Sequence, residues 1–299
     1  MIDKYLVDIV ILNFNQEADT NECILSLKRM NYKNYRIILV DNDSFDGSGF
    51  RIKERFREIE LLRSEKNLGF AGGCNLAIRR SMEKNPSGYI LLLNNDTIVS
   101  ENLLDSLLSV AEGSEEIGIA GAVNYYYNDP EKIHMSAHRF LWWLGIQKRA
   151  QGDIDAAFKE AQSVSACCML IKKEVIQTIG LFDERFFIYY EDSDLCLRAR
   201  RAGFKVVAVR NAKVWHKITA VFGTKTAREY YIYTRNQPLF MLKNCPKLFL
   251  PIYFCVYFSK VSIRIIYFFA TFRKEIAAAI LNGAVDFFRG RFGKRRLFA

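Results

Sequence analysis

The 299-residue chain lacks the cysteine and glycine patterns that mark several common classes of protein. Its seven cysteines form no C-x-x-C pair, and Cys167 next to Cys168 suits neither a disulfide framework nor a zinc knuckle. We therefore expect reduced, mostly buried thiols in a cytosolic compartment. The chain also has no P-loop and no G-x-G-x-x-G after its first strand, which argues against a nicotinamide-dinucleotide site.

Acidic residues are scarce near the C-terminus. Residues 241–299 hold eleven Lys or Arg but two acids, a net charge of +9, whereas residues 1–240 are nearly neutral. This asymmetry indicates that the tail, rather than the body, meets an anionic surface. We predict a catalytic domain over 1–240 and a basic amphipathic helical region over 241–299. The uncharged run from Leu248 to Ser259 is shorter than the ~20 residues of a spanning helix.

The tail is predicted to lie in a membrane interface. A helix over 248–272 would have cations on one narrow face, with Tyr253 and Tyr257 beside it and apolar residues elsewhere, so we expect the cations to face lipid phosphates. The alternative is a helical pair that packs on the body or on a second subunit, which would make a homo-oligomer. Because the cations lie among Phe and Ile, a membrane explains them better than nucleic acid does. The residues on the narrow face are Lys260, Arg264, Tyr267, Thr271 and Lys274.

The first 125 residues alternate strand and helix patterns. Alternation of this kind predicts an α/β fold with a mixed, mostly parallel sheet flanked by helices. Residues 125–162 read as an irregular loop or lid, and a strand, two helices and a further strand follow before residue 210. Strands are expected over 7–13, 35–42, 59–63, 89–95 and 117–124, and helices near 20–30, 47–58, 72–84 and 100–112.

Polar residues end several of these strands, where ligands of parallel sheets bind. The buried run "YILLL" stops at Asn94, Asn95 and Asp96, whose oxygens suit Mg²⁺ or Mn²⁺, although the same residues also make a good turn. In "VDNDSFDGS", Asp41 can accept from a base imide or a ribose hydroxyl, and Asp46 can cap the next helix.

Two further segments carry candidate chemistry. In "NLGFAGGCN" the glycines permit a close backbone approach to a ligand at a helix start, which favours anions. In "YYEDSDLC", Glu191, Asp192 and Asp194 either charge a helix N-terminus or supply a general base. His216, one of three histidines, is either structural or a metal ligand.

In this order, the segments resemble a family 2 glycosyltransferase of the GT-A fold, in its bacterial rhamnosyltransferase-like subgroup. The resemblance spans residues 7–236 and implies a nucleotide-sugar donor, a divalent metal (Mg²⁺ or Mn²⁺) and an inverting single displacement. The segments that carry it are "DIVILNFNQ", "ILVDNDSFDGS", "EKNLGFAGGCNLAIR", "YILLLNNDTIV", "SACCMLIKKEVIQTIGLFDERFFIYYEDSDLCLRARRAGFKV" and "YYIYTRN".

The resemblance also implies roles for single residues. Asp192 would be the base, with Glu191 and Asp194 positioning it or the acceptor. Asp96 would bind the metal where the family has its D-x-D, with His216 as a further ligand. Asn94 departs from that motif, since relatives with a full D-x-D have an acid there. The nucleotide sugar would be held by Asn13, Asn15, Asp41, Asn67, Gly72, Asn94 and Asn95.

The implied substrates are a dTDP- or UDP-linked sugar and a saccharide on a polyprenyl diphosphate. Rhamnose is favoured by the subgroup alone, and other hexoses from UDP stay open. We expect a peripheral protein at the cytoplasmic face of a bacterial inner membrane, active in surface polysaccharide synthesis. The alternatives are a non-catalytic membrane-associated scaffold derived from such an enzyme and, less favoured, a nucleotidyltransferase. The turn after the first strand lacks the Gly-rich, cationic loop of the latter.

Overall fold

The computed structural model describes residues 5–83, 88–150, 154–217 and 226–294. Its main sheet has the strand order β10-β12-β6-β11-β4-β1-β2-β3, with β5 added beside β12 and β7 beside β6. The sheet is mixed and mostly parallel, as predicted, with β11 antiparallel between β4 and β6. The strands that frame the site are β1 (Val7–Asn13), β2 (Tyr35–Asn42), β3 (Glu60–Ser64), β4 (Tyr89–Asn94), β5 (Thr97–Val99), β6 (Ile117–Tyr126), β11 (Cys168–Lys172) and β12 (Lys205–His216).

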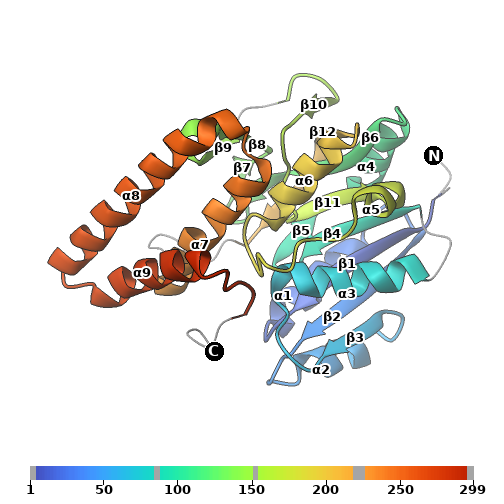
Figure 1. The fold of residues 1–299 in the computed structure, drawn as a ribbon. Helices are drawn as coiled ribbons and strands as arrows, with labels where there is room; N and C mark the ends of the chain where they lie inside the picture. Colours follow the sequence, from blue (N-terminus) through green and yellow to red (C-terminus); the bar gives the residue numbers. More distant parts are fainter. Residues whose placement is uncertain (1–4, 84–87, 151–153, 218–225, 295–299) are drawn as a thin grey trace.

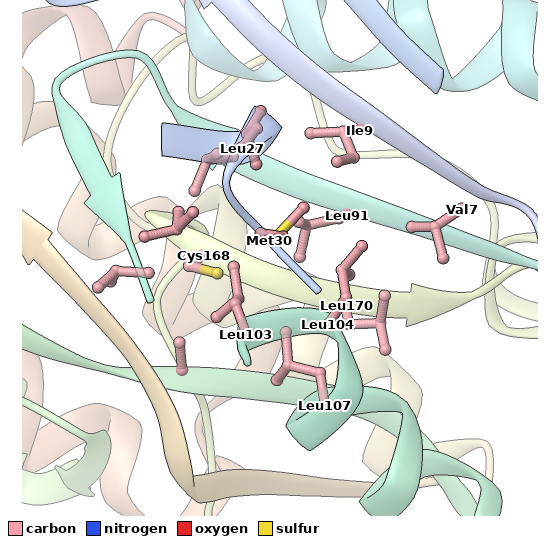
Figure 2. Close-up of a cluster of buried hydrophobic side chains, with 14 of the residues drawn as sticks. Val7, Ile9, Leu27, Met30, Leu91, Leu103, Leu104, Leu107, Cys168 and Leu170 are labelled. Atoms are coloured by element: carbon pink, nitrogen blue, oxygen red, sulfur yellow. The ribbon is translucent and has the colours of Figure 1, made fainter. Parts of the chain in front are cut away.

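Helices cover both faces of this sheet (Figure 1). Side chains of β1 alternate between two cores: Val7 and Ile9 pack with α1 and α4 on one face, and Val10 packs with α3 on the other. Figure 2 shows part of the first core, where strand residues meet Leu27 and Leu104. Burial on both faces explains the near-continuous apolar strands. The helices are α1 (Glu17–Lys28), α2 (Ser48–Arg55), α3 (Gly69–Glu83), α4 (Leu103–Glu112), α5 (Lys173–Ile179) and α6 (Glu191–Arg201).

The prediction of an irregular lid over 125–162 is wrong. Most of this segment is strand, and two of its strands form a separate ribbon whose tip packs on α8. The ribbon is stabilised by tertiary contacts, such as that of Phe140 with Phe240, whose ring centroids are 5.2 Å apart, and no local pattern reveals these contacts. The elements are β7 (Asp129–Met135), β8 (Ala137–Leu141), η1 (Trp142–Leu144), β9 (Ile146–Ala150) and β10 (Phe158–Glu160).

Three α-helices lie in the last described segment, residues 226–294: α7 (Ala227–Asn244), α8 (Leu250–Ala270), which follows the short turn η3 (Lys247–Phe249), and α9 (Lys274–Phe288). The boundary predicted at residue 240 falls inside α7. In Figure 1, α8 and α9 project from the sheet as a pair. Among the described residues, one segment, Lys247–Ala270, is long and apolar enough to cross a membrane by length and composition.

The orientation predicted for the cations of α8 is wrong for Lys260. Its Nζ donates to the carbonyl of Leu144, at 2.8 Å, and therefore points toward the ribbon. Tyr253 and Tyr257, on the same side of the helix, are buried. The exposed residues of α8 are mostly apolar, with Arg264 exposed among them as predicted.

Candidate active site

The carboxyl ends of three adjacent strands meet at one edge of the sheet. Asn13 is in register with Asp41, and Leu12 is in register with Asn94. The polar residues that end β1, β2 and β4 therefore lie side by side, as the parallel arrangement predicts.

Asn13 and Asn15 shape the turn after β1. Asn13 is fully buried, where its Nδ2 donates to the hydroxyls of Ser44 and Ser48 and its Oδ1 accepts from Thr20. Asn15 has a left-handed backbone (φ 56°), and its side chain accepts from the amide of Phe45. The hydrogen bonds of the buried Asn13 side chain thus stabilise the turn.

Asp41 is almost completely buried next to α2. One carboxylate oxygen accepts from the amide of Ser44, at 3.2 Å, and the other faces Arg63 Nε, at 3.3 Å. A Cβ on Gly49 would come within 2.5 Å of this carboxylate, so a glycine is required there. Asp41 therefore has its own protein partners, and its role toward a nucleoside stays a prediction.

The glycines at the start of α3 pack against protein in a way the sequence did not indicate. Asn67 Oδ1 accepts from the amide of Gly69, which has φ +71°. A Cβ on Gly69 would lie 2.4 Å from the carbonyl of Phe187, and one on Gly72 would lie 2.8 Å from Leu68 Cβ. The close backbone approach at these two glycines is therefore to other protein atoms.

Asp96 and His216 lie together although 120 residues separate them. The antiparallel pairing of β5 with the end of β12 places His216 opposite Thr97. Asp96 Oδ1 is 3.0 Å from His216 Nε2, and Asn94 Nδ2 is 3.5 Å from the same nitrogen. Asn95 turns the other way, donating to Gln16 and Thr20 at the start of α1. The structure thus brings together the two residues predicted to bind a metal.

The pair fits a divalent cation in chemistry and spacing. Bonds of about 2.1 Å at right angles separate neighbouring ligands by roughly 3 Å, as in this pair. Burial lowers the pKa of His216, but the side chains of Cys167 and Asp96 outweigh that effect, so the pKa lies well above its usual value. A cation that binds His216 would therefore have to displace a proton from its ring. Among the described residues, no group of three or more His, Cys, Asp or Glu could hold a metal. The remaining ligands would come from a diphosphate and water, as is common for such ions.

Asp192 and Glu191 begin α6, as predicted. Asp192 is partly exposed; its oxygens accept from the amides of Ser193, at 2.6 Å, and Ala166, at 3.3 Å. Burial raises the pKa of Asp192, and the two amides oppose that shift. Burial and the charge of Asp192 raise the pKa of Glu191 well above its usual value. Glu191 therefore holds a proton more readily, and Asp192 is the better candidate base.

Asp194 is tied to α7. Its carboxylate accepts from Arg198 and Asn244, at 2.9 Å each, and from Lys243, at 3.0 Å. It is fully buried. With every oxygen engaged, Asp194 can act on the base only through the placement of α6.

A strained arch precedes the base, and sequence reasoning missed it. Phe187, Tyr189 and Tyr190 all have left-handed backbones, with φ of 65°, 70° and 76°. Asn236 of α7 donates from Nδ2 to three carbonyls of this segment, those of Phe186, Ile188 and Tyr189, at 2.7, 2.9 and 3.2 Å. The "YTRN" motif contains this asparagine, but nothing in the motif indicates which carbonyls it meets.

One segment joins the predicted metal site to the predicted base. The amide of Ala166 donates to Asp192. The carbonyl of the next residue, Cys167, accepts from the amide of Asn94, at 2.9 Å, and its side chain interacts with His216. The pair predicted to bind a cation and the predicted general base therefore flank the same two residues, an arrangement that would suit displacement of a diphosphate by a hydroxyl.

Solved structures share this architecture. A mannosyltransferase from Pyrobaculum calidifontis, solved with GDP-Man and Mn²⁺, superposes with a TM-score of 0.58 at 11% identity, covering 97% of this chain and 89% of that one. GalNAc-T7, solved with UDP, GalNAc and Mn²⁺, superposes with a TM-score of 0.62 at 15% identity, covering 78% and 51%. These likenesses show the fold, which is GT-A.

Proteins that are similar in sequence are also glycosyltransferases. A dTDP-rhamnosyl transferase of Shigella flexneri, RfbF, is 28% identical over 257 residues, 81% of this chain and 82% of that protein. An N-acetylglucosaminyl-diphospho-decaprenol L-rhamnosyltransferase of Mycobacterium tuberculosis is 23% identical over 237 residues, 71% and 76% of the two chains. Residues 8–180 match the family model described as Glycosyl transferase family 2. The chain belongs to this family and is a glycosyltransferase of the GT-A fold.

Proposed function

We propose that this glycosyltransferase moves a sugar from a nucleotide diphosphate to a hydroxyl of a lipid-linked saccharide, with inversion, in surface polysaccharide synthesis. The observation that carries the proposal is the placement of Asp96–His216 and Asp192 on either side of Ala166 and Cys167. The names of the two sequence relatives support rhamnose as the sugar, and the name of the Shigella flexneri relative supports dTDP as the nucleotide. UDP-linked hexoses remain the alternative.

In the proposed reaction Asp192 accepts the proton of the acceptor hydroxyl as that oxygen attacks the sugar carbon. The start of α6 and the amides of Ser193 and Ala166 stabilise its ionised form. Asp96 and His216 would hold Mn²⁺ or Mg²⁺, which when bound neutralises charge on the leaving diphosphate. Asn94 adds no charge there, so among the described residues Asp96 would be the one carboxylate that binds the metal.

A thermal-shift screen tests the donor half of this proposal. We expect dTDP-rhamnose or UDP-sugars with Mn²⁺ to raise the melting midpoint, since a ligand at 100 times its Kd adds about 2.7 kcal/mol to the free energy of unfolding. The Asp96→Asn variant should lose the part of the shift that needs Mn²⁺. If no sugar nucleotide shifts the midpoint with or without metal, the donor assignment is wrong.

We also propose that α8 and α9 attach the protein to the cytoplasmic face of a bacterial inner membrane. The support is the exposed apolar face of α8, where Ile263 and Ile266 are 66% and 68% exposed. Phe272, 86% exposed, follows the helix, and the cations Arg273 and Lys274 adjoin it. An apolar face beside cations is typical of binding to anionic lipids.

The double variant Ile263→Glu/Ile266→Glu should lose most binding to vesicles that contain phosphatidylglycerol, because two charges would enter the apolar layer. Flotation of the full chain measures this, and Leu25→Glu, on the distant helix α1, is the control. Unchanged flotation would contradict the attachment. The wild-type chain could instead be a dimer that does not float with vesicles, and the double variant could convert that dimer to monomers. This result would identify the exposed face of α8 as a subunit interface.

A further inference from the structure

A cavity of about 450 Å³ lies outside the predicted donor and base sites. It is formed by the β8–β9 ribbon, by β10 with the residues after it, and by the last turns of α6. Five of its lining residues are cations, and Glu160 is the single acid among them. The cations are Arg139, Lys148, Arg149, Lys159 and Arg200.

The placement of these charges is unfavourable without an anion. Arg139 and Lys148 are directly opposite each other in the ribbon, and like charges in that position destabilise a strand pair. Glu160 is already paired with Arg200, at 2.8 Å. In the described part of the chain, Arg139, Lys148 and Lys159 contact no acidic side chain. The cavity thus holds excess positive charge that a bound anion would neutralise.

The cavity is connected to the base by hydrogen bonds. Gln147, next to Lys148, donates to the hydroxyl of Ser193, at 2.8 Å. Ser163, next to the lining residue Gln162, is 3.1 Å from the same hydroxyl. Ser193 in turn donates its amide to Asp192. Along α6, the eight residues from Asp192 to Arg200 span roughly 12 Å, so the cavity and base are near neighbours.

The same ribbon packs on the buried side of α8, the helix whose exposed face is proposed to meet the membrane. Its tip packs on α8, where Leu144 accepts from Lys260 and Gly145 lies against Tyr253. At the tip, Trp143 is 44% exposed. A lipid that lies along α8 could therefore place its head group at this cavity and its saccharide near α6.

We propose that this cavity binds the phosphate groups of a lipid-borne anion, the diphosphate of the acceptor. Lys and Arg bind phosphate oxygens by charge-assisted hydrogen bonds, Arg often in pairs. This proposal rests on the proposed lipid-linked acceptor. The cavity would be the place where the acceptor's diphosphate binds, and its cations would be the residues that hold it.

Binding of farnesyl diphosphate to the full chain tests the site, with farnesol and inorganic diphosphate as comparison ligands. The variant Arg139→Glu/Lys148→Glu should raise the Kd for farnesyl diphosphate at least tenfold. Arg55→Glu/Arg57→Glu, with the same charge change on exposed residues at the end of α2, should leave it within twofold. Arg139→Gln/Lys148→Gln should weaken binding while keeping or raising the melting midpoint of the free protein, since it removes the repulsion.

The outcomes separate the sources of phosphate. If the charge-reversal variant instead loses binding only to phosphatidylglycerol vesicles, the lipid-borne anion is a phospholipid head group. Equal Kd values for wild type and both ribbon variants would overturn the proposal, and so would binding of inorganic diphosphate alone. The donor thermal shift is measured in parallel. The protein could bind farnesyl diphosphate through the ribbon cations and yet not be stabilised by any sugar nucleotide. That result would refute the proposed sugar transfer but would still support the cavity as a phosphate-binding site.

Discussion

Replacement of Asp192 by asparagine should lower the rate of sugar transfer by roughly 10²- to 10⁴-fold, the usual contribution of a general base. The amide keeps the shape of the side chain, and its single oxygen can still accept from the amide of Ser193, although the 3.3 Å bond from Ala166 is lost; the fold and the donor thermal shift should be unchanged. It cannot take a proton from a hydroxyl. Product formation at saturating donor and acceptor measures the loss.

The pH profile gives this prediction a second readout. The base works ionised, and burial raises the pKa of Asp192, so kcat/KM should fall with decreasing pH through a value above that of an ordinary carboxyl group. The Asp192→Asn variant should lose this decrease of kcat/KM at low pH, and the Asp105→Asn variant, changed on α4, should keep it. Wild-type rates in Asp192→Asn would show that another group is the base. A wild type that neither transfers nor hydrolyses any donor would favour the non-catalytic scaffold.

Replacement of Asn236 by alanine should lower kcat by roughly 10- to 100-fold, although this residue is outside the predicted site. Left-handed backbone at residues other than glycine costs about 1–3 kcal/mol each, and the arch has three such residues just before Glu191. The amide of Asn236 holds three carbonyls of that arch. Without it the arch relaxes, and the start of α6 moves with it.

The measurement must separate positioning from loss of folding. A displaced α6 loses the bond from the amide of Ala166, which lowers the pKa of Asp192, so the acid limb of kcat/KM should move to higher pH in Asn236→Ala, an effect that lower stability alone does not produce. Thr234→Ala, a buried residue of the same helix that donates only within it, is the matched control. If the Asn236→Ala variant keeps the wild-type kcat and the wild-type pH dependence of kcat/KM, Asn236 does not position the base.

Much of the site could be predicted because its parts are local. The apolar strands and the polar residues after them define β1, β2 and β4, and parallel strands bring those ends to one edge. The acids at residues 191–194 mark the start of α6, where the helix dipole favours them. The family resemblance named Asp96 and His216 as a pair, and β5 beside β12 brings them within 3.0 Å.

The amino-acid sequence by itself determined the alternating α/β core, because burial of a strand on both faces leaves a long apolar run that any fold must cover. Tertiary structure alone decided three features: the β8–β9 ribbon in place of a lid, the contact of Lys260 with Leu144, and the arch held by Asn236. The packing of the ribbon on α7 and α8, like the other two features, depends on contacts between residues about 50 or more positions apart. Periodicity reports which face of an element is buried, but not which partner buries it.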